Sequence, residues 1–330
     1  MSNATENKRI EYIDLLKGFA ILWIVWWHTC HPAFIDPYYH VPLFFFISGI
    51  FFKPYPLKEY LKKKTDKILI PFAFFYLISY LYRFLLHLWD NRTIENFPWG
   101  NIFDVFKCMP NGDYLWVNVP IWFLLCLFNV CIFYYFIYKL PLWFKCTYIV
   151  IVLLLSSKIT QISTPFFIND AIKWTAYYAL GDIAGKKILQ HLSDTSKGII
   201  YLIVCCILYI VFKLIFRDYH LFFFDGFDIQ LSTVIFIIGI TSLFSFAQGK
   251  KALNFLRYYG NNSLIVLGTH APVLIVYQRI ICKYFGSVNY WGGLFVFIAT
   301  SLTMIIVIPV LKKYFPKFIG VKPLLSTSNR

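Results

Sequence analysis

The chain has 330 residues, of which 59% are hydrophobic, 21% aromatic and only 14% charged, and its mean hydropathy is +0.63. Soluble globular proteins contain about 45–50% apolar and about 25% charged residues. The composition therefore excludes a water-soluble enzyme, a disordered protein and a nucleic-acid-binding protein. Because a membrane-spanning helix needs about 20 apolar residues, the sequence predicts an all-α, polytopic helix bundle in contact with membrane lipids.

Ten apolar runs are the candidate spans. They lie at about 12–30, 39–52, 68–89, 119–138, 146–158, 172–188, 199–216, 229–248, 259–282 and 291–311. The first run follows a polar tail and no small-residue cleavage site comes after it, so we expect a retained span and not a removed signal peptide. We expect one domain over 1–330, with tails at 1–11 and 312–330 and no appended soluble domain.

The charges of alternate loops predict how the chain is oriented. With the N-terminus in the cytosol, the inside segments hold 21 Lys and Arg residues and the outside segments hold six. The positive-inside rule then places both termini in the cytosol and requires an even number of spans. The Lys-rich segment 53–67 is interpreted as an inside loop that touches anionic lipid, and no nucleic-acid partner is expected.

Ionisable residues in the first run are the strongest functional signal, since each costs about 2.5–3.5 kcal/mol to insert into a membrane. Lys17 and His28 are eleven residues apart, which places them on nearly the same helical face and about 16–17 Å apart along the axis. Asp14 precedes Lys17 by three residues and can pair with it. Alternatively, Asp14 and Lys17 reach water at the membrane boundary, and His28 and His31 lie at the outer interface.

The run 259–282 carries a second polar group. Ser263 and His270 are seven residues apart and share a face, and His270 falls near the middle of the span. Pro272 is expected to bend the helix and to free backbone groups close to His270. The alternative interpretation of His270 is a buried histidine that is bonded to a neighbouring carbonyl.

Candidate substrate contacts lie toward the predicted outer side. Arg83 stands in the run 68–89, and Trp116 and Trp122 stand before and inside the run 119–138. The tryptophans could stack on a sugar or belong to the aromatic belt of the membrane interface. The loop 90–118 could be a lid or a plain connector. Cysteine spacing predicts no metal site, and a Cys30–Cys108 disulfide is a weak alternative to free thiols.

The order of several short motifs resembles the membrane-bound acyltransferase 3 family. A basic residue at the end of Asp14-Leu-Leu-Lys17, ten further residues and then His28 resemble the family's opening, although many members have Arg where this chain has Lys17. Similar elements follow in order over most of the chain: Leu43-Phe-Phe-Phe-Ile-Ser48-Gly49, Lys67-Ile-Leu-Ile-Pro71, Ile121-Trp122-Phe123-Leu124, Tyr178-Ala-Leu-Gly181-Asp182 and Gly260-Asn-Asn-Ser263 through His270. The form with Asp14 and Lys17 looks most like the fucose 4-O-acetylase-like branch.

The resemblance implies an enzyme that moves an acyl group, commonly acetyl from acetyl-CoA, to a hydroxyl of a sugar in a surface or lipid-linked glycan. It implies a multi-pass protein of a bacterial cytoplasmic membrane, without a metal. Lys17 and Asp14 would then bind the donor, His28 would be the general base, and His270 would orient the acceptor or stabilise the oxyanion. The predicted substrate-binding residues are Trp116, Trp122, Ser263 and Arg83. The sequence carries no indication of an oligomeric state.

Two other functions remain as alternatives at this point. A transporter or flippase for a glycolipid or small solute would also have many spans with charges inside the membrane. Such proteins often contain two related halves with interrupted helices in matching positions, and no such pairing is visible here. A structural or assembly subunit is the other alternative, against which the polar face of the first run argues.

Overall fold

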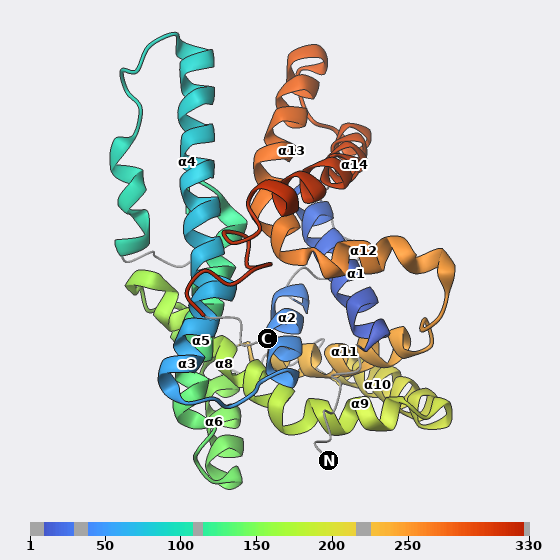
Figure 1. Ribbon diagram of the computed structural model, residues 1–330. Helices are drawn as coiled ribbons and strands as arrows, with labels where there is room; N and C mark the ends of the chain where they lie inside the picture. The colour runs from blue at the N-terminus through green and yellow to red at the C-terminus, as the bar shows by residue number, and fades with distance from the viewer. Residues whose placement is uncertain (1–9, 30–38, 108–114, 216–225, 327–330) are drawn as a thin grey trace.

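The computed structural model describes residues 10–29, 39–107, 115–215 and 226–326. These residues form helices without a β-strand (Figure 1), which confirms the all-α prediction. The helices of the first half are α1 (Glu11–Thr29), α2 (His40–Ile50), α3 (Leu57–Lys64), η2 (Thr65–Leu69), α4 (Ile70–Asn91), η3 (Trp99–Phe106), η4 (Val119–Ile121), α5 (Trp122–Ile137), α6 (Leu142–Leu154) and α7 (Ser156–Thr160).

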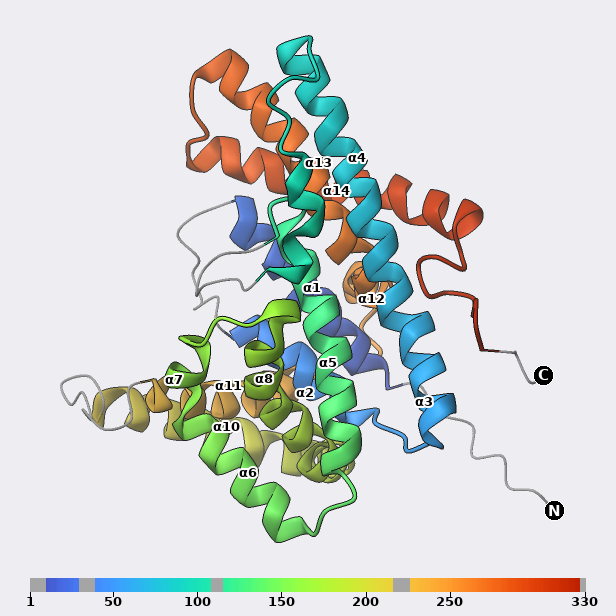
Figure 2. The ribbon, with the colours of Figure 1, turned by 90° about the vertical axis from the view of Figure 1, so that its left-hand side faces the viewer.

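The second half of the chain is also helical. Its helices are η5 (Pro165–Phe167), α8 (Ile168–Leu180), η6 (Gly181–Gly185), α9 (Lys186–Leu192), α10 (Thr195–Ile215), α11 (Phe227–Ser245), η7 (Lys251–Leu253), α12 (Asn254–Asn261), α13 (Ser263–Phe285) and α14 (Tyr290–Tyr314). Figure 2 shows α10 and α11 side by side at one end of the molecule, with α4 and α13 extending away from them at the other.

Six helices in the described part of the chain are long and apolar enough to cross a membrane. They are the continuous helix Leu57–Asn91, the helix Val119–Ile137, α10, α11, α13 and α14. Each of the ten predicted runs overlaps a helix, but α2 and α6 are shorter than a full span. The chain is therefore a multi-pass membrane protein, while the count of ten spans and the cytosolic termini stay predictions.

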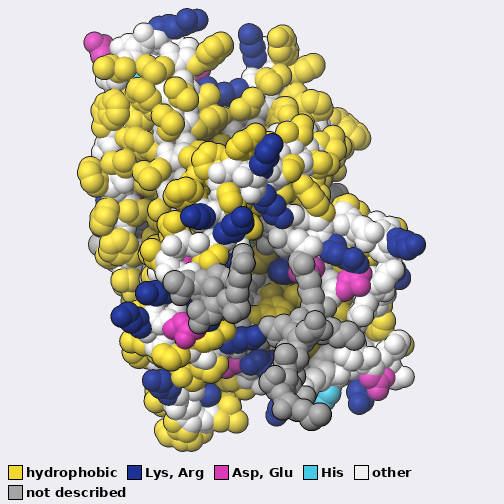
Figure 3. Space-filling model, in the orientation of Figure 1, with side chains coloured by type: hydrophobic (Ala, Val, Ile, Leu, Met, Phe, Trp, Pro, Cys, Tyr) yellow, Lys and Arg dark blue, Asp and Glu magenta, His cyan; other side chains and the backbone are white. Residues whose placement is uncertain are grey.

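The outer surface carries large apolar side chains where lipid would lie. Ile200, Ile207 and Leu214 on α10 are exposed, as are Leu302 and Ile306 on α14. Figure 3 shows mostly hydrophobic side chains over α4, α13 and α14 in the upper part of the view, with some Lys and Arg side chains at the top edge and more of them over the middle and lower parts. A continuous apolar surface of this kind fits hydrocarbon and not water.

α1 and α12 cross with their backbones in direct contact. A Cβ atom built at Gly18 would overlap the carbonyl of Leu256, and one built at Gly260 would overlap the carbonyl of Asp14. Small residues at a helix crossing allow such an approach inside a membrane. The pair of glycines therefore fixes α1, the helix with the predicted donor and base residues, against α12.

A second glycine crossing fixes α2. A Cβ atom at Gly49 would overlap the carbonyl of Tyr178, and one at Gly181 would overlap the carbonyl of Phe46. α2 therefore lies directly on the junction of α8 and η6. The two crossings set the positions of α1 and α2, and the space between these helices holds the candidate site.

Candidate active site

A cavity of about 210 Å³ lies between α1, α2, α5 and the start of α13. On the α1 side its wall consists of Lys17, Ile21, Ile24 and His28. The spacing of four, three and four residues is that of one helical face. The predicted shared face of Lys17 and His28 is thus confirmed, and this face lines the cavity.

One end of the cavity contains an ion pair. Lys17 Nζ lies 2.8 Å from Asp14 Oδ1, so the predicted pairing of these two residues is confirmed. Asp14 is only 4% exposed, whereas the side chain of Lys17 is 25% exposed, so the carboxylate is buried and the ammonium group is partly open. The ammonium group is therefore held at the cavity by a buried carboxylate.

Imidazole groups gather at the other end. His28 and His40 both line the cavity, and the ring centroids of His28 and His270 are 5.4 Å apart. His40 comes from the first turn of α2 and packs against Trp23, with ring centroids 5.9 Å apart. Its Nδ1 is buried and has no hydrogen-bond partner in the described part of the chain. His40 could not be recognised as a site residue from the sequence, because a lone histidine at the start of an apolar run gives no spacing signal.

His270 is fully buried, and one of its ring nitrogens is held in a hydrogen bond. Its Nδ1 lies 2.8 Å from the carbonyl oxygen of Val266, one turn earlier in α13. Nδ1 must carry the proton of that bond, so a neutral ring leaves Nε2 as an acceptor, and Nε2 has no partner among the described residues. The carbonyl-bonded alternative is therefore confirmed for Nδ1. His270 is not among the residues that line the cavity and adjoins it through His28.

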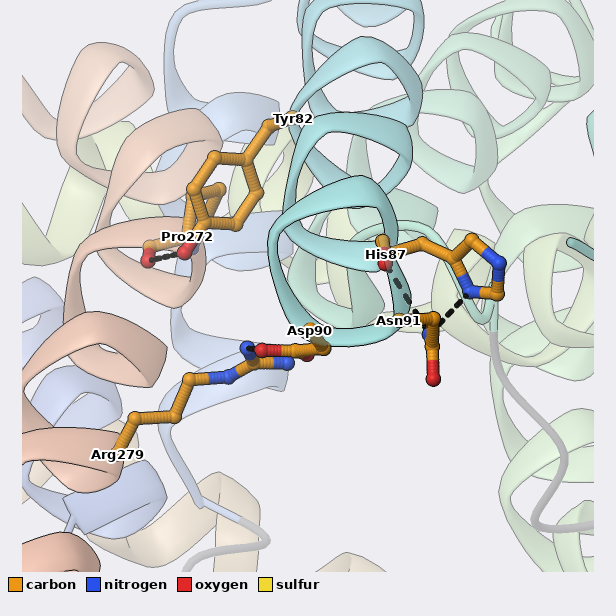
Figure 4. A network of polar contacts seen from close by, with 6 residues as sticks. All are labelled: Tyr82, His87, Asp90, Asn91, Pro272 and Arg279. Atoms are coloured by element: carbon orange, nitrogen blue, oxygen red, sulfur yellow. Dashed lines mark hydrogen bonds and ion pairs between the residues drawn. The ribbon is translucent and has the colours of Figure 1, made fainter. Parts of the chain in front are cut away.

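Pro272 frees backbone groups next to His270, as predicted. Since proline has no N–H, the carbonyl of Gly268 loses its helical donor. Asn118 Nδ2 replaces that donor at 2.9 Å and also donates to Ser79 Oγ at 2.8 Å. The carbonyl of Pro272 in turn accepts from Tyr82 Oη at 3.0 Å (Figure 4). The segment before α5 thereby joins α4 to α13 at the level of His270.

The four predicted substrate residues fall into two places. Ser263 and Trp122 line the cavity. Arg83 and Trp116 do not line it, but they contact each other, with the guanidinium carbon 5.3 Å from the indole ring. Arg83 Nε also donates to the carbonyl of Val117 at 3.3 Å. The structure thus separates a cavity group from a group at the outer part of α4.

Other predicted features have simpler outcomes. In the described ranges, no group of three or more His, Cys, Asp or Glu side chains is arranged to hold a metal ion. His31, Cys30 and Cys108 lie outside the residues that the structure describes. Part of the loop 90–118 packs along α4, where Tyr76 Oη donates to the carbonyl of Asn101 at 2.9 Å.

The fold and the cavity define a class: a multi-pass helical membrane protein whose cavity between the helices has an ammonium group at one end and imidazoles at the other. The family model for an acyltransferase domain, Acyl_transf_3, matches residues 10–312. The chain belongs to this acyltransferase 3 family and is a membrane acyltransferase. No curated protein and no solved structure matches the chain. The family match does not assign the chain to the fucose 4-O-acetylase-like branch.

Proposed function

We propose that this acyltransferase moves an acetyl group from acetyl-CoA to a hydroxyl of a sugar in a surface or lipid-linked glycan of a bacterial cytoplasmic membrane. The observation that supports it is the cavity along one face of α1, which begins at Lys17 and ends at His28. Eleven residues of helix span about 16–17 Å. This length is comparable to that of an extended pantetheine arm, so the thioester would reach His28 when a phosphate is near Lys17.

The Lys17 end suits the donor. Acetyl-CoA is a polyanion, and the ammonium of Lys17 would meet a phosphate or the upper part of the arm. Asp14 keeps that ammonium in place through the 2.8 Å ion pair. The excess of cations on the predicted cytosolic side would raise the local concentration of the donor there. Ile21 and Ile24 would line the path of the arm.

His28 would be the general base of a direct transfer. Its neutral ring takes the proton of the acceptor hydroxyl as the oxygen attacks the thioester carbonyl carbon. The new C–O bond forms first, the C–S bond of the tetrahedral intermediate then breaks, and the thiolate of CoA receives the proton from His28. Trp122 and Ser263 line the same cavity and would contact the bound substrates.

His270 would support His28 and not the acceptor itself. Its Nδ1 is committed to Val266, and its bare Nε2 can only accept a hydrogen bond while the ring is neutral. Such an acceptor beside His28 would select the ring orientation and tautomer of the base. His270 is therefore proposed as a positioning residue.

His40 would stabilise the oxyanion of the tetrahedral intermediate. It lines the cavity together with His28, and its Nδ1 has no hydrogen-bond partner among the residues that the structure describes. A ring N–H directed at the thioester oxygen would act where negative charge develops, which is the position in which a hydrogen-bond donor contributes most to the rate.

Labelled acetyl transfer tests the proposal. Purified protein in lipid nanodiscs receives radiolabelled acetyl-CoA and a glycolipid extract of its own cells. We expect His28→Ala to lower the rate by about 10²–10⁴-fold, the usual contribution of a general base. The matched control is His191→Gln, an exposed histidine that bonds Tyr201. Full activity of His28→Ala would end the assignment, and solute counterflow without acetyl-CoA would support a transporter instead.

A further inference from the structure

Arg83 holds a positive charge at membrane depth. On both sides of it along α4, Leu81 and Leu85 are each 55% exposed and form part of an apolar stripe. Arg83 itself is half-buried and lies on the other side of the helix, against Trp116 and Val117. A charge at this depth is costly and is normally retained for a function or a partner.

The protein gives Arg83 no carboxylate partner among the described residues. Within the described part of the chain, its one hydrogen bond runs from Nε to the carbonyl of Val117. Asp90, two turns further along α4, is occupied by Arg279 at 2.6 and 2.9 Å (Figure 4). A guanidinium group has five N–H donors, so four of those of Arg83 have no hydrogen-bond partner among the described residues.

Arg83 lies level with the imidazoles of the candidate active site. Its neighbour Tyr82 donates to the carbonyl of Pro272, two residues beyond His270. Val117, the acceptor of Arg83 Nε, is followed by Asn118, which donates to Gly268, two residues before His270. A group bound at Arg83 would therefore lie beside the end of the cavity where His270 contacts His28.

We infer that Arg83 and Trp116 bind an anionic group, a phosphate or a carboxylate, carried by the acyl acceptor. The free edge of a guanidinium matches the paired oxygens of either group, and the indole beside it offers a flat apolar face to a sugar ring. The acceptor is thus an acidic sugar or a phosphate-bearing glycolipid. This inference rests on the proposed function, since it assigns the acceptor of that reaction.

Binding is measured first, without acetyl-CoA. The probes are decyl β-glucoside, decyl β-glucuronide and the 6-phosphate of decyl β-glucoside, added to purified protein in a neutral detergent. We expect one or both anionic probes to raise the unfolding temperature and the neutral probe not to do so. A response to the phosphate alone, or to the glucuronide alone, identifies which anion the site takes.

The variants decide whether Arg83 causes the shift. Arg83→Gln should abolish it, Arg83→Lys should retain part of it, and Lys283→Gln should leave it unchanged. Lys283 is the matched control because it is an exposed cation near the end of α13. Equal shifts in wild type and Arg83→Gln, or no response to either anion, would overturn the inference. If Arg83→Gln does not fold, a full shift in Lys283→Gln together with a reduced one in Arg83→Lys supports the proposal, and an unreduced shift in Arg83→Lys overturns it.

Acetyl transfer to the same three probes separates this inference from the proposed function. We expect the wild type to use an anionic probe with at least tenfold higher kcat/KM than the neutral one. Arg83→Gln should remove this preference through the KM of the acceptor, with an unchanged KM for acetyl-CoA. Equal use of neutral and anionic probes overturns the inference alone. Absence of transfer to any probe, with Arg83-dependent anion binding intact, counts against the proposed function alone.

Discussion

Two helix pairs of this acyltransferase are joined in different ways. α1 and α12 touch through their backbones at Gly18 and Gly260, whereas the outer parts of α4 and α13 are joined by side chains, among them the exposed pair of Asp90 and Arg279 (Figure 4). Exposed ion pairs contribute little to stability. The helix of Lys17 and His28 is therefore held rigidly, while the outer ends can separate at low cost.

The largest effect is expected at the backbone crossing. Gly18→Ala places a methyl group on the carbonyl of Leu256, which cannot move aside as a side chain can. Overpacking costs about 1–3 kcal/mol and occasionally more, so we expect at least about 3 kcal/mol here. The measurement is the unfolding temperature and monodisperse yield in detergent. Gly100→Ala, with no atom within 4 Å of its added Cβ, is the control, and equal stability of the two variants would disprove the close crossing.

The next largest effect is expected on donor binding. Lys17→Ala removes the ammonium that we place near a phosphate, and hydrogen bonds of charged groups contribute about 1.5–3 kcal/mol. The KM for acetyl-CoA should rise about 10–100-fold with little change in kcat. Lys17→Arg should restore much of the binding. Because Lys17→Ala also removes the ion pair with the buried Asp14, Asp14→Asn/Lys17→Ala serves as the control, and a normal KM in both variants would remove the donor role.

A smaller effect is expected where the segment before α5 joins α4 to α13. Asn118→Ala leaves the carbonyl of Gly268 without a donor, which costs about 1–3 kcal/mol for a buried group. Thermal unfolding should show this loss, and acetyl transfer should fall because His270 lies on the same turn. Asn101→Ala is the control, since Asn101 accepts from Tyr76 through its backbone carbonyl. An unchanged unfolding temperature would argue against the link.

The smallest effect is expected at the outer ends. A double-mutant cycle of Asp90→Asn and Arg279→Gln should give a coupling free energy of about 0.2–1 kcal/mol, and this value should decrease with added salt. Thermal unfolding of the four proteins supplies the cycle. A coupling free energy above about 2 kcal/mol would contradict the difference between the two helix pairs. The outer ends of α4 and α13 would then be joined almost as firmly as α1 and α12.

The sequence predicted those parts of the site that lie on one helix. The spacing of Lys17 and His28 sets their shared face whatever surrounds them, and Asp14 is near enough in the chain to be recognised as a partner. Likewise, Pro272 predicted that a backbone carbonyl one turn earlier in the helix, that of Gly268, would lack its helical donor. In such cases helix geometry alone determines the result.

Contacts between distant segments could not be predicted in the same way. Asn118 and Gly268 are 150 residues apart, and His40 reaches the cavity only because glycines fix α2 against α8 and η6. The predicted run 259–282 is divided into α12 and α13 at Asn262. The hydropathy of the run does not show this break, because a hydropathy value is an average over many residues and the few polar residues at the break change it little.

The position of Lys17 and His28 on a single rigid helix has a consequence for donor choice. Their separation is set by the α1 helix itself, and the main-chain contacts at Gly18 and Gly260 fix that helix against α12. A carrier with a shorter arm than that of CoA would leave its thioester short of the imidazole, and a longer one would carry it beyond. Under the proposed function, the cavity would select its donor by length, and an acyl group on a truncated thiol such as N-acetylcysteamine should be a poor substitute even at high concentration.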